Sequence, residues 1–309
     1  MALEIRRAAV LDIGTNAIKF LIAEKNAHGD WETVLDTSQV TRLGQGLHSS
    51  GLLNTAAMER SIAAIQKFLG IAREQQVDHI LAVGTMALRT AANAQDFVER
   101  LRREANLNIQ IIDGEEEARL SWLAVISSLP VPKARWLIFD VGGGSTEFIL
   151  SQDRQLLGKI SLNIGVVRLT EQILISDPVT DEEVQLADRS IKAAFQAIPW
   201  SGPISVLVGV GATMTTLGAM QHQLRRYQAN LIHGLQLSYH DVTTLVSALK
   251  SKTIAERKRM PGLPADRADV ILAGGMIVSA IMKQMQSKSV IISDRGVRHG
   301  LLIDRFHSE

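Results

Sequence analysis

Short apolar runs and longer runs with helical spacing alternate along this chain. The short runs at 8–11, 18–22, 77–83 and 136–139 predict buried strands. Between the second and the third run, apolar side chains recur at spacings of three and four, at Met58, Ile62, Ile65, Leu69 and Ala72. That spacing predicts an amphipathic helix of about five turns, with Asn54 as its cap.

The remaining segments continue the same alternation. Further strands are predicted at 31–40, 109–112, 204–208 and 290–292. Further helices are predicted at 93–106, 115–128, 166–174, 266–285 and 296–306. Another helix is predicted to begin at Thr180, where Glu183 completes a capping box. Strands that alternate with helices indicate an α/β fold with crossover connections.

Two of the predicted strands end in the same way. The run 8–11 is followed by Asp12-Ile13-Gly14-Thr15-Asn16, and the run 136–139 by Asp140-Val141-Gly142-Gly143-Gly144-Ser145-Thr146-Glu147. Each segment turns through glycine into a second apolar run, so each predicts a β-hairpin with an acidic residue at its tip. The recurrence suggests two related domains that face one anionic ligand.

A chain of 309 residues exceeds one ordinary core, so two domains are expected. The segment 129–133 is the clearest linker, because Pro130 and Pro132 favour extended backbone. We therefore expect domains at 1–128 and 129–309, an arrangement in which the last helix can pack back on the first domain.

Composition excludes several functional classes. A net charge of +1 gives no long-range field to attract nucleic acid or a membrane surface, and the absence of cysteine excludes disulfides and thiolate chemistry. The sequence has no run of eighteen apolar residues and no signal-like N-terminus. We expect a cytoplasmic protein without nucleic-acid or membrane partners.

The glycines of the second hairpin indicate an anion site. Gly142, Gly143 and Gly144 place no Cβ between the backbone and a ligand, so their N–H groups can converge on a phosphate. Ser145 adds a hydroxyl donor. The alternative is a sharp turn that uses glycine only for its backbone freedom; three successive glycines between two carboxylates favour binding.

Carboxylates flank that turn at Asp140 and Glu147. Two carboxylates beside a phosphate site suit Mg²⁺, which takes few protein oxygens and completes its shell with water and phosphate. Asp12, at the matching tip, can supply a third oxygen. Aspartates also commonly accept hydrogen bonds from turn N–H groups, and for Asp12 both roles stay open.

Three glutamates open the helix predicted at 115–128. The helix dipole alone accounts for carboxylates in a first turn. Glu117, however, shares its stripe with Leu120 and Ala124, an inward-facing set, where a carboxylate can act as a general base on water. Both interpretations of Glu117 stay open at this point.

The first half of the chain offers further phosphate contacts. Arg89 follows the strand end at 84–85 and is a candidate bidentate clamp, although a solvated arginine at a helix start is an equal alternative. Thr15 and Asn16 offer donors in the first turn. Lys19 offers a charge, which strand alternation is expected to turn away.

Several familiar motifs are missing from the sequence. It has no P-loop, no dinucleotide-binding G-x-G-x-x-G and no zinc-binding histidine spacing. His240-Asp241, at a predicted helix start, is a weak metal-phosphohydrolase signature.

The paired hairpins and the Gly209-Val210-Gly211-Ala212-Thr213 turn resemble the actin-like ATPase superfamily. Within it, the chain resembles the exopolyphosphatase and guanosine pentaphosphate phosphohydrolase family, short two-domain form. Besides the hairpin tips, the matching segments lie at 41–47, 84–89, 113–120, 261–269 and 293–300. They follow the family's order over nearly the whole chain.

The resemblance implies two ribonuclease-H-like domains with the active site in the cleft between them. It implies Glu117 as the catalytic residue and Asp140 and Glu147 as magnesium ligands. It also implies phosphate binding by Arg89, Ser145 and the glycine turns, including Gly211. The chain departs from the family at the first loop, where Thr15 and Ala17 replace serines.

The expected function is magnesium-dependent hydrolysis of the terminal phosphate of inorganic polyphosphate, with the 5′-γ-phosphate of guanosine pentaphosphate as a second substrate. A polyphosphate/ADP phosphotransferase and a guanosine-alarmone sensor with little turnover are the alternatives. The sequence does not rank the two substrates, because selectivity depends on the directions of Arg42, Arg267, Arg295 and Arg298. A homodimer is the expected assembly.

Overall fold

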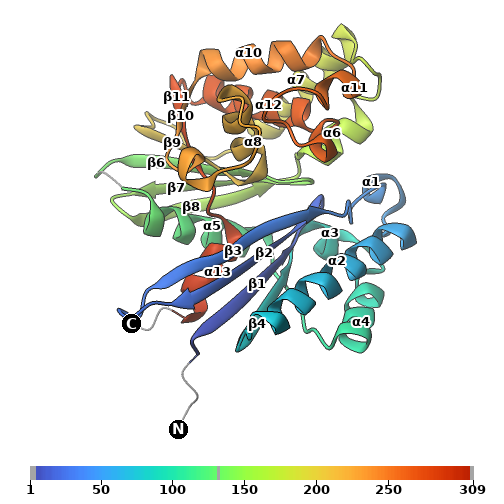
Figure 1. The fold of residues 1–309 in the computed structure, drawn as a ribbon. Helices are drawn as coiled ribbons and strands as arrows, with labels where there is room; N and C mark the ends of the chain where they lie inside the picture. The colour runs from blue at the N-terminus through green and yellow to red at the C-terminus, as the bar shows by residue number, and fades with distance from the viewer. Residues whose placement is uncertain (1–4, 131–132, 307–309) are drawn as a thin grey trace. The chain divides into compact units, whose positions relative to one another are not determined.

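The computed structural model describes residues 5–130 and 133–306, which form two compact units (Figure 1). Unit 1 comprises the described residues up to Leu120 together with those from Val297 onward, and unit 2 comprises Ser121–Gly296. The division falls inside helix α5 (Gly114–Ser128), which begins in unit 1 and ends in unit 2. Within the linker expected at 129–133, residues 131 and 132 lie outside the described residues.

Unit 1 is built on a five-stranded sheet in the order β3-β2-β1-β4-β5. Its strands are β1 (Arg7–Ile13), β2 (Ala17–Lys25), β3 (Trp31–Val40), β4 (His79–Gly84) and β5 (Gln110–Ile111). The first three strands pair antiparallel, and β1 pairs with β4 in parallel. The hairpin predicted at Asp12 is therefore the centre of this sheet.

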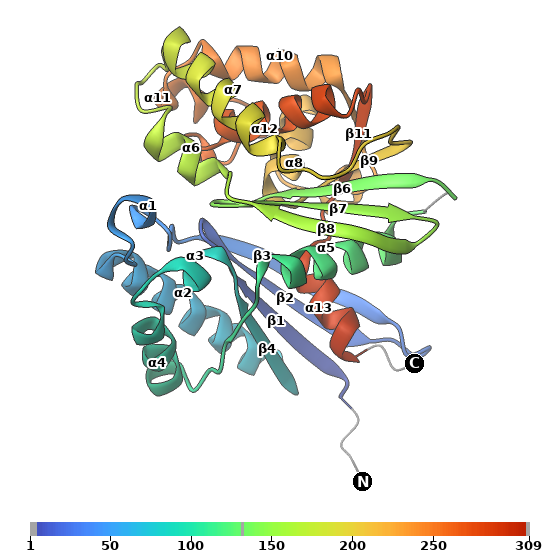
Figure 2. The ribbon, with the colours of Figure 1, turned by 180° about the vertical axis from the view of Figure 1, so that it is seen from behind.

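Strand alternation decides which helices cover each face of the unit 1 sheet. Ala9, Leu11 and Ile13 of β1 enter one core with the helices of residues 47–105, whereas Ala8 and Val10 enter another with the last helix. The helices of the first core are α1 (Leu47–Ser50), α2 (Thr55–Glu74), α3 (Met86–Thr90) and α4 (Ala94–Ala105). The last helix, α13 (Val297–Phe306), covers the opposite face (Figure 2).

Unit 2 repeats this plan with a six-stranded sheet in the order β10-β11-β9-β6-β7-β8. Its strands are β6 (Arg135–Val141), β7 (Thr146–Gln152), β8 (Gln155–Leu162), β9 (Val206–Val210), β10 (Gln236–Ser238) and β11 (Ser289–Ser293). Strands β6 and β7 form the second predicted hairpin, and β6 pairs with β9 in parallel, as β1 does with β4.

Helices pack on one face of the unit 2 sheet around Leu137, Phe139 and Val141 of β6. The helices of unit 2 are α6 (Val166–Gln172), α7 (Asp181–Phe195), α8 (Gly211–Gln221), α9 (Ala229–Ile232), α10 (Tyr239–Lys250), α11 (Ile254–Arg257) and α12 (Ile271–Gln284). The end of α5 is tied to β7 by a hydrogen bond from Trp122 Nε1 to Ser151 Oγ at 3.1 Å. Among the described residues, no helix has the length and apolar content needed to cross a membrane.

The structure confirms most of the predicted elements and their caps. Asn54 caps α2 by accepting from two backbone N–H groups, and Thr180 and Glu183 form the predicted capping box of α7. The single helix predicted at 266–285 is wrong: a 3₁₀ turn (Ala265–Arg267) with i→i+3 hydrogen bonds precedes α12. Strands β8 and β10 were not predicted.

Two helical glycines give a stability test of this fold. A Cβ on Gly300 of α13 would lie 1.9 Å from the carbonyl oxygen of Leu120, whereas a Cβ on Gly70 of α2 would meet nothing within 4 Å. We expect Gly300→Ala to lower the free energy of unfolding by about 3 kcal/mol through overpacking. Gly70→Ala should raise it by about 1 kcal/mol, because alanine loses less backbone entropy in a helix.

Urea unfolding of both variants measures the two effects. Equal effects of the two substitutions would contradict the close packing of α13 against α5.

Candidate functional site

The two hairpin tips place a pair of charged side chains in the same register. Asp12 lies opposite Lys19 in the β1–β2 ladder, and Asp140 lies opposite Glu147 in the β6–β7 ladder. The turns close alike, by Gly14 N–H donating to Ala17 O at 3.1 Å and Gly142 N–H donating to Ser145 O at 2.9 Å. The two tips are therefore the same local structure with one charge reversed.

Both aspartates lie near the carboxyl ends of parallel strand pairs. Asp12 is in register with Val83 of β4, and Asp140 with Val210 of β9. Helix α3 follows β4 and helix α8 follows β9. In α/β sheets, ligands bind outside this edge of the strands, so the topology of each unit directs its tip toward a ligand.

Close backbone approach surrounds the carboxylate of Asp140, which is buried. Gly211, the first residue of α8, has a φ of +86°, and a Cβ there would lie 2.4 Å from Asp140 Oδ1. A Cβ on Gly296 would lie 3.7 Å from Asp140 Oδ2. Gly211, expected to bind phosphate, therefore lies against the acidic side chain and lets the N-terminus of α8 approach its negative charge.

Asp140 and Glu147 are 6% and 1% exposed and project from the same face of the β6–β7 ladder. Ser161 Oγ of β8 donates to Glu147 Oε1 at 2.7 Å. Two like charges directly opposite each other are unfavourable unless a cation or a proton compensates them. The described residues contain no group of three or more acidic or histidine side chains arranged for a metal, and the metal-binding role of Asp140 and Glu147 stays a prediction.

Helix α6 holds the glycine turn of residues 142–144 through backbone hydrogen bonds. Val166 N–H donates to Gly142 O at 3.0 Å, and Val167 N–H donates to Gly143 O at 2.8 Å. A Cβ on Gly165 would lie 2.5 Å from Gly143 O, so only glycine allows this contact. The carbonyl oxygens, which would repel a phosphate, thus accept hydrogen bonds from the helix.

In unit 1 the corresponding carboxylate has a cationic neighbour. Lys19 Nζ is 2.9 Å from Asp12 Oδ2, and the Asp12 side chain is 3% exposed. The expectation that Lys19 points away was wrong, because directly opposite residues of an antiparallel ladder share a face. The ion pair partly neutralises Asp12, and its part as a third metal ligand stays a prediction.

Thr15 and Asn16 are buried in a loop that the segment 41–44 supports. Gly44 N–H donates to Thr15 O at 2.9 Å, and Arg42 N–H donates to Asn16 O at 2.9 Å. These hydrogen bonds fix the loop through backbone atoms and do not involve the side chains of Thr15 and Asn16. Their phosphate-binding role stays a prediction.

Glu117 is joined to Arg89 within unit 1. Arg89 Nη1 of α3 lies 3.2 Å from Glu117 Oε2 of α5, and the same nitrogen donates to Ile112 O at 2.9 Å. The Glu117 side chain is 12% exposed, so it is largely shielded yet accessible to water. Arg89, expected to clamp phosphate, is thus also placed to orient the Glu117 carboxylate.

The neighbouring glutamate has a different environment. Glu116 accepts two hydrogen bonds from Arg119, at 2.7 and 2.8 Å, and Arg119 also donates to Asp304 of α13 at 2.8 Å. These carboxylates raise the pKa of Arg119 above its usual range. Glu116 therefore helps to connect α5 with α13 through Arg119, whereas Glu117 contacts the guanidinium of Arg89.

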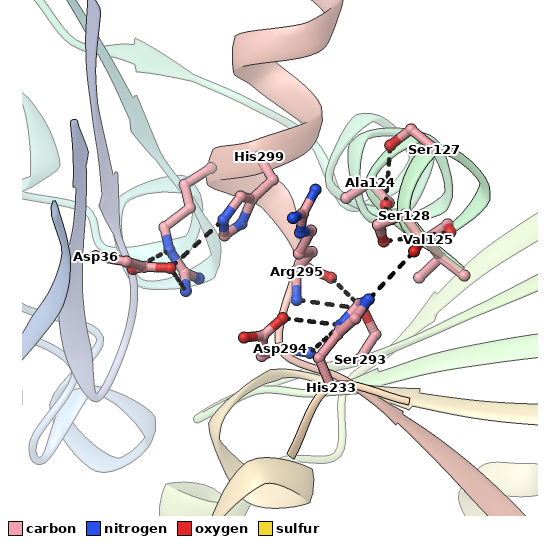
Figure 3. Close-up of polar contacts among 11 residues, drawn as sticks. Asp36, Ala124, Val125, Ser127, Ser128, His233, Ser293, Asp294, Arg295 and His299 are labelled. Carbon is pink, nitrogen blue, oxygen red and sulfur yellow. Dashed lines mark hydrogen bonds and ion pairs between the residues drawn. The ribbon is translucent and has the colours of Figure 1, made fainter. Parts of the chain in front are cut away.

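Other sequence candidates have structural roles. Asp241 forms a capping box with Ser238 at the start of α10, and hydrogen bonds from Ser238 lower the pKa of Asp241. Arg298 donates twice to Asp36 of β3, both at 2.8 Å, and His299 Nε2 is 3.4 Å from the same carboxylate (Figure 3). In unit 2, His233 Nδ1 lies 2.8 Å from Asp294 Oδ1.

Sequence reasoning missed three contributors to the unit 2 tip: Ser161, Gly165 and Gly296. Ser161 lies on the unpredicted strand β8, so no signal pointed to its bond with Glu147. The two glycines are visible in the sequence, but only the fold brings them against Gly143 and Asp140.

Comparison with known proteins agrees with this arrangement. The profile of the Ppx/GppA phosphatase family matches residues 21–309. Exopolyphosphatase 2 of Mycobacterium tuberculosis is 28% identical over 96% of this chain and 98% of its own length. Exopolyphosphatase 1 of the same organism is 27% identical over 98% of this chain and 89% of its own length.

Solved structures support the same grouping. A Ppx/GppA family member from Aquifex aeolicus is 32% identical, covers 97% of each chain and superimposes with a TM-score of 0.81. An exopolyphosphatase from Cytophaga hutchinsonii is 27% identical over 98% of each chain, with a TM-score of 0.90. The expected two-unit α/β fold matches that of the Aquifex aeolicus family member. The chain belongs to the Ppx/GppA phosphatase family.

Proposed function

We propose that this protein is an exopolyphosphatase, a phosphoric anhydride hydrolase that removes the terminal phosphate of inorganic polyphosphate. The observation that carries the proposal is the facing pair of buried carboxylates, Asp140 and Glu147, beside the glycine turn. Family membership and the relatives that are named exopolyphosphatases support the substrate class.

Glu117 is the proposed general base. Its carboxylate is largely shielded and is oriented by the ion pair with Arg89, so that it can accept a proton from the attacking water. Arg89 acts on the reaction through Glu117 and is therefore a positioning residue in this proposal. Burial on the inward stripe of α5 restricts the rotamers of Glu117 and directs its oxygens.

Asp140 and Glu147 would hold Mg²⁺, the cation that two protein carboxylates with water and phosphate oxygens suit best. When bound, the ion neutralises charge on the phosphoryl oxygens. Asp12 plays a smaller part because of its ion pair with Lys19.

Phosphate oxygens are held by donors of the two tips in this proposal. Backbone N–H groups at Gly143 and Gly144 and the hydroxyl of Ser145 bind oxygens at the unit 2 tip. Thr15 and Asn16 do the same at the unit 1 tip. Such donors are fixed before the substrate arrives, so little reorganisation accompanies the reaction.

The same site is proposed to act on guanosine pentaphosphate, the second substrate expected from the sequence. The 5′-γ-phosphate of guanosine pentaphosphate is a terminal phosphoanhydride like that of polyphosphate, so the same groups can cleave it. The cytoplasmic location, the homodimer and the domain boundary at residues 128/129 stay predictions. Release of free phosphate with and without ADP separates hydrolysis from phosphotransfer.

The first test replaces Glu117, the proposed general base. We expect Glu117→Gln to lower kcat for polyphosphate by about 10²–10⁴, because a neutral amide cannot accept the proton from water. Glu116→Gln, one residue away and bonded to Arg119, is the matched control and should keep activity near the wild-type value. Phosphate release within about threefold of wild type in Glu117→Gln would exclude the assignment of the base.

Arg89 offers a test of positioning against phosphate binding. Arg89→Met removes the cation next to Glu117, which disfavours the ionised base, so the acidic limb of the kcat–pH profile should move to higher pH. Arg89→Lys should restore part of the wild-type profile. A rise in KM with an unmoved pH profile would instead make Arg89 a substrate-binding residue.

Metal dependence tests the carboxylate pair. Chelation with EDTA should abolish phosphate release, and added Mg²⁺ should restore it. Asp140→Asn and Glu147→Gln should each raise the Mg²⁺ concentration for half-maximal activity by about tenfold or more, because each removes one charged oxygen donor. Asp12→Asn should have a smaller effect. Undiminished activity in EDTA would contradict the proposed metal site.

A further inference from the structure

Three parallel strands of unit 2 bring one short loop to the proposed metal site. In the order β11-β9-β6, Ser293 pairs with Val210, and Val210 pairs with Asp140, so the three residues form one row across the sheet. Directly after this row the chain leaves β11 through the loop 294–296. A Cβ on Gly296 would lie 3.1 Å from Val210 Cγ1 and 3.7 Å from Asp140 Oδ2. The loop therefore lies beside the carboxylate that is proposed to hold the cation.

The shape of this loop is set by the hydroxyl of Ser293, whose side chain is buried. The hydroxyl donates to Arg295 O at 2.9 Å, and it accepts from Arg295 N–H at 3.2 Å. Hydroxyl groups commonly fix turns in this way. A second contact joins the loop to other elements of unit 2.

That second contact is the pair of His233 and Asp294. His233 Nδ1 lies 2.8 Å from Asp294 Oδ1 and 3.4 Å from the backbone nitrogen of the same residue. The other ring nitrogen, Nε2, lies 3.3 Å from Ser128 O at the end of α5 (Figure 3). Polar partners on both sides thus fix the orientation of the imidazole ring.

The backbone next to His233 is also anchored. Gly234 N–H donates to Ile292 O at 2.8 Å, and Ile292 N–H donates to Leu235 O at 2.8 Å. His233 is therefore joined to strand β11 through its neighbours in the chain, and to the loop after β11 through its ring. The ring thereby determines where the loop 294–296 lies relative to the sheet.

Stability alone does not account for a polar pair at this place. The side chains of His233 and Asp294 are 21% and 13% exposed, so both have lost most of their hydration. A well-packed apolar pair of similar volume is often as stable as a buried ionic pair. What the polar pair adds is one defined geometry, because hydrogen bonds are directional.

We propose that His233 and Asp294 are positioning residues for the phosphatase reaction. They hold the loop 294–296 against Asp140 and thereby restrict the carboxylate to the rotamer that holds the cation. The inference rests on the proposed function, because it assigns Mg²⁺ to Asp140. In this proposal neither His233 nor Asp294 touches the substrate or the metal.

Amide hydrogen exchange of the full chain, without metal or substrate, tests the effect on the loop. The Arg295 amide, which donates to Ser293 Oγ, should exchange about tenfold faster in His233→Leu than in wild type, because the loop opens more often. His222→Leu, the same change at an exposed histidine of unit 2, is the matched control and should leave this exchange unchanged. Unaltered exchange of the Arg295 amide in His233→Leu would overturn the proposal.

Magnesium binding separates positioning from stability. In calorimetric titration of the full chain with Mg²⁺ alone, His233→Leu should bind the ion about tenfold more weakly than wild type. His233→Asn, which keeps a polar atom near the place of Nδ1, should recover part of the affinity.

A double variant sharpens this test. His233→Leu/Asp294→Leu should regain the free energy of unfolding that His233→Leu loses, since it removes the buried carboxylate together with its partner. The double variant should nevertheless keep the weakened Mg²⁺ binding. Recovery of stability and Mg²⁺ affinity together would show a merely structural pair and overturn the positioning role.

The outcomes distinguish this inference from the proposed function. Wild type that binds Mg²⁺ and releases phosphate, with unchanged Mg²⁺ affinity in His233→Leu, would overturn the inference alone. Wild type that neither binds Mg²⁺ nor releases phosphate would contradict the proposed function, and the inference with it.

Discussion

Two carboxylates held face to face in a protein interior form the constraint around which the second unit is organised. Asp140 and Glu147 are forced together by the register of β6 and β7, and burial denies them the solvent that would otherwise separate their charges. Neighbouring elements compensate: Ser161 donates to Glu147, and the glycine that opens α8 lets a helix N-terminus approach Asp140.

The first unit meets the same constraint with a different solution. Lysine at position 19 neutralises Asp12 across an equivalent pair of strands. The proposed base of this unit is Glu117, where α3 and α5 bring an arginine against the carboxylate. The two hairpins therefore have the same backbone structure but different local charge, because single side chains at corresponding positions differ.

Sequence alone predicted what depends on local pattern. Both hairpins, the amphipathic helix α2 with its Asn54 cap and the Thr180 capping box follow from periodicity and short-range hydrogen bonding. Strand β8 escaped prediction because its mixed polar sequence is stabilised by pairing with β7 rather than by its own pattern. The 3₁₀ turn before α12 escaped it because apolar spacing does not distinguish i→i+3 from i→i+4 bonding.

The candidate site residues show the same difference between local sequence pattern and long-range contact. Asp140, Glu147 and the glycine turn were found because one contiguous segment encodes them. The contacts of Glu117 with Arg89, of Asp12 with Lys19 and of Asp140 with Gly296 join residues whose proximity only the fold supplies. Motifs thus supplied the candidate groups, whereas their neighbours became visible only in the tertiary structure.

The charge reversal between the two tips has a kinetic consequence. Asp140 and Glu147 place two carboxylates at the unit 2 tip, whereas Asp12 and Lys19 place one carboxylate and one ammonium group at the unit 1 tip. Under the proposed function, the cation would reach the unit 2 tip before the polyanion or together with it, so substrate binding there would depend on the counterion.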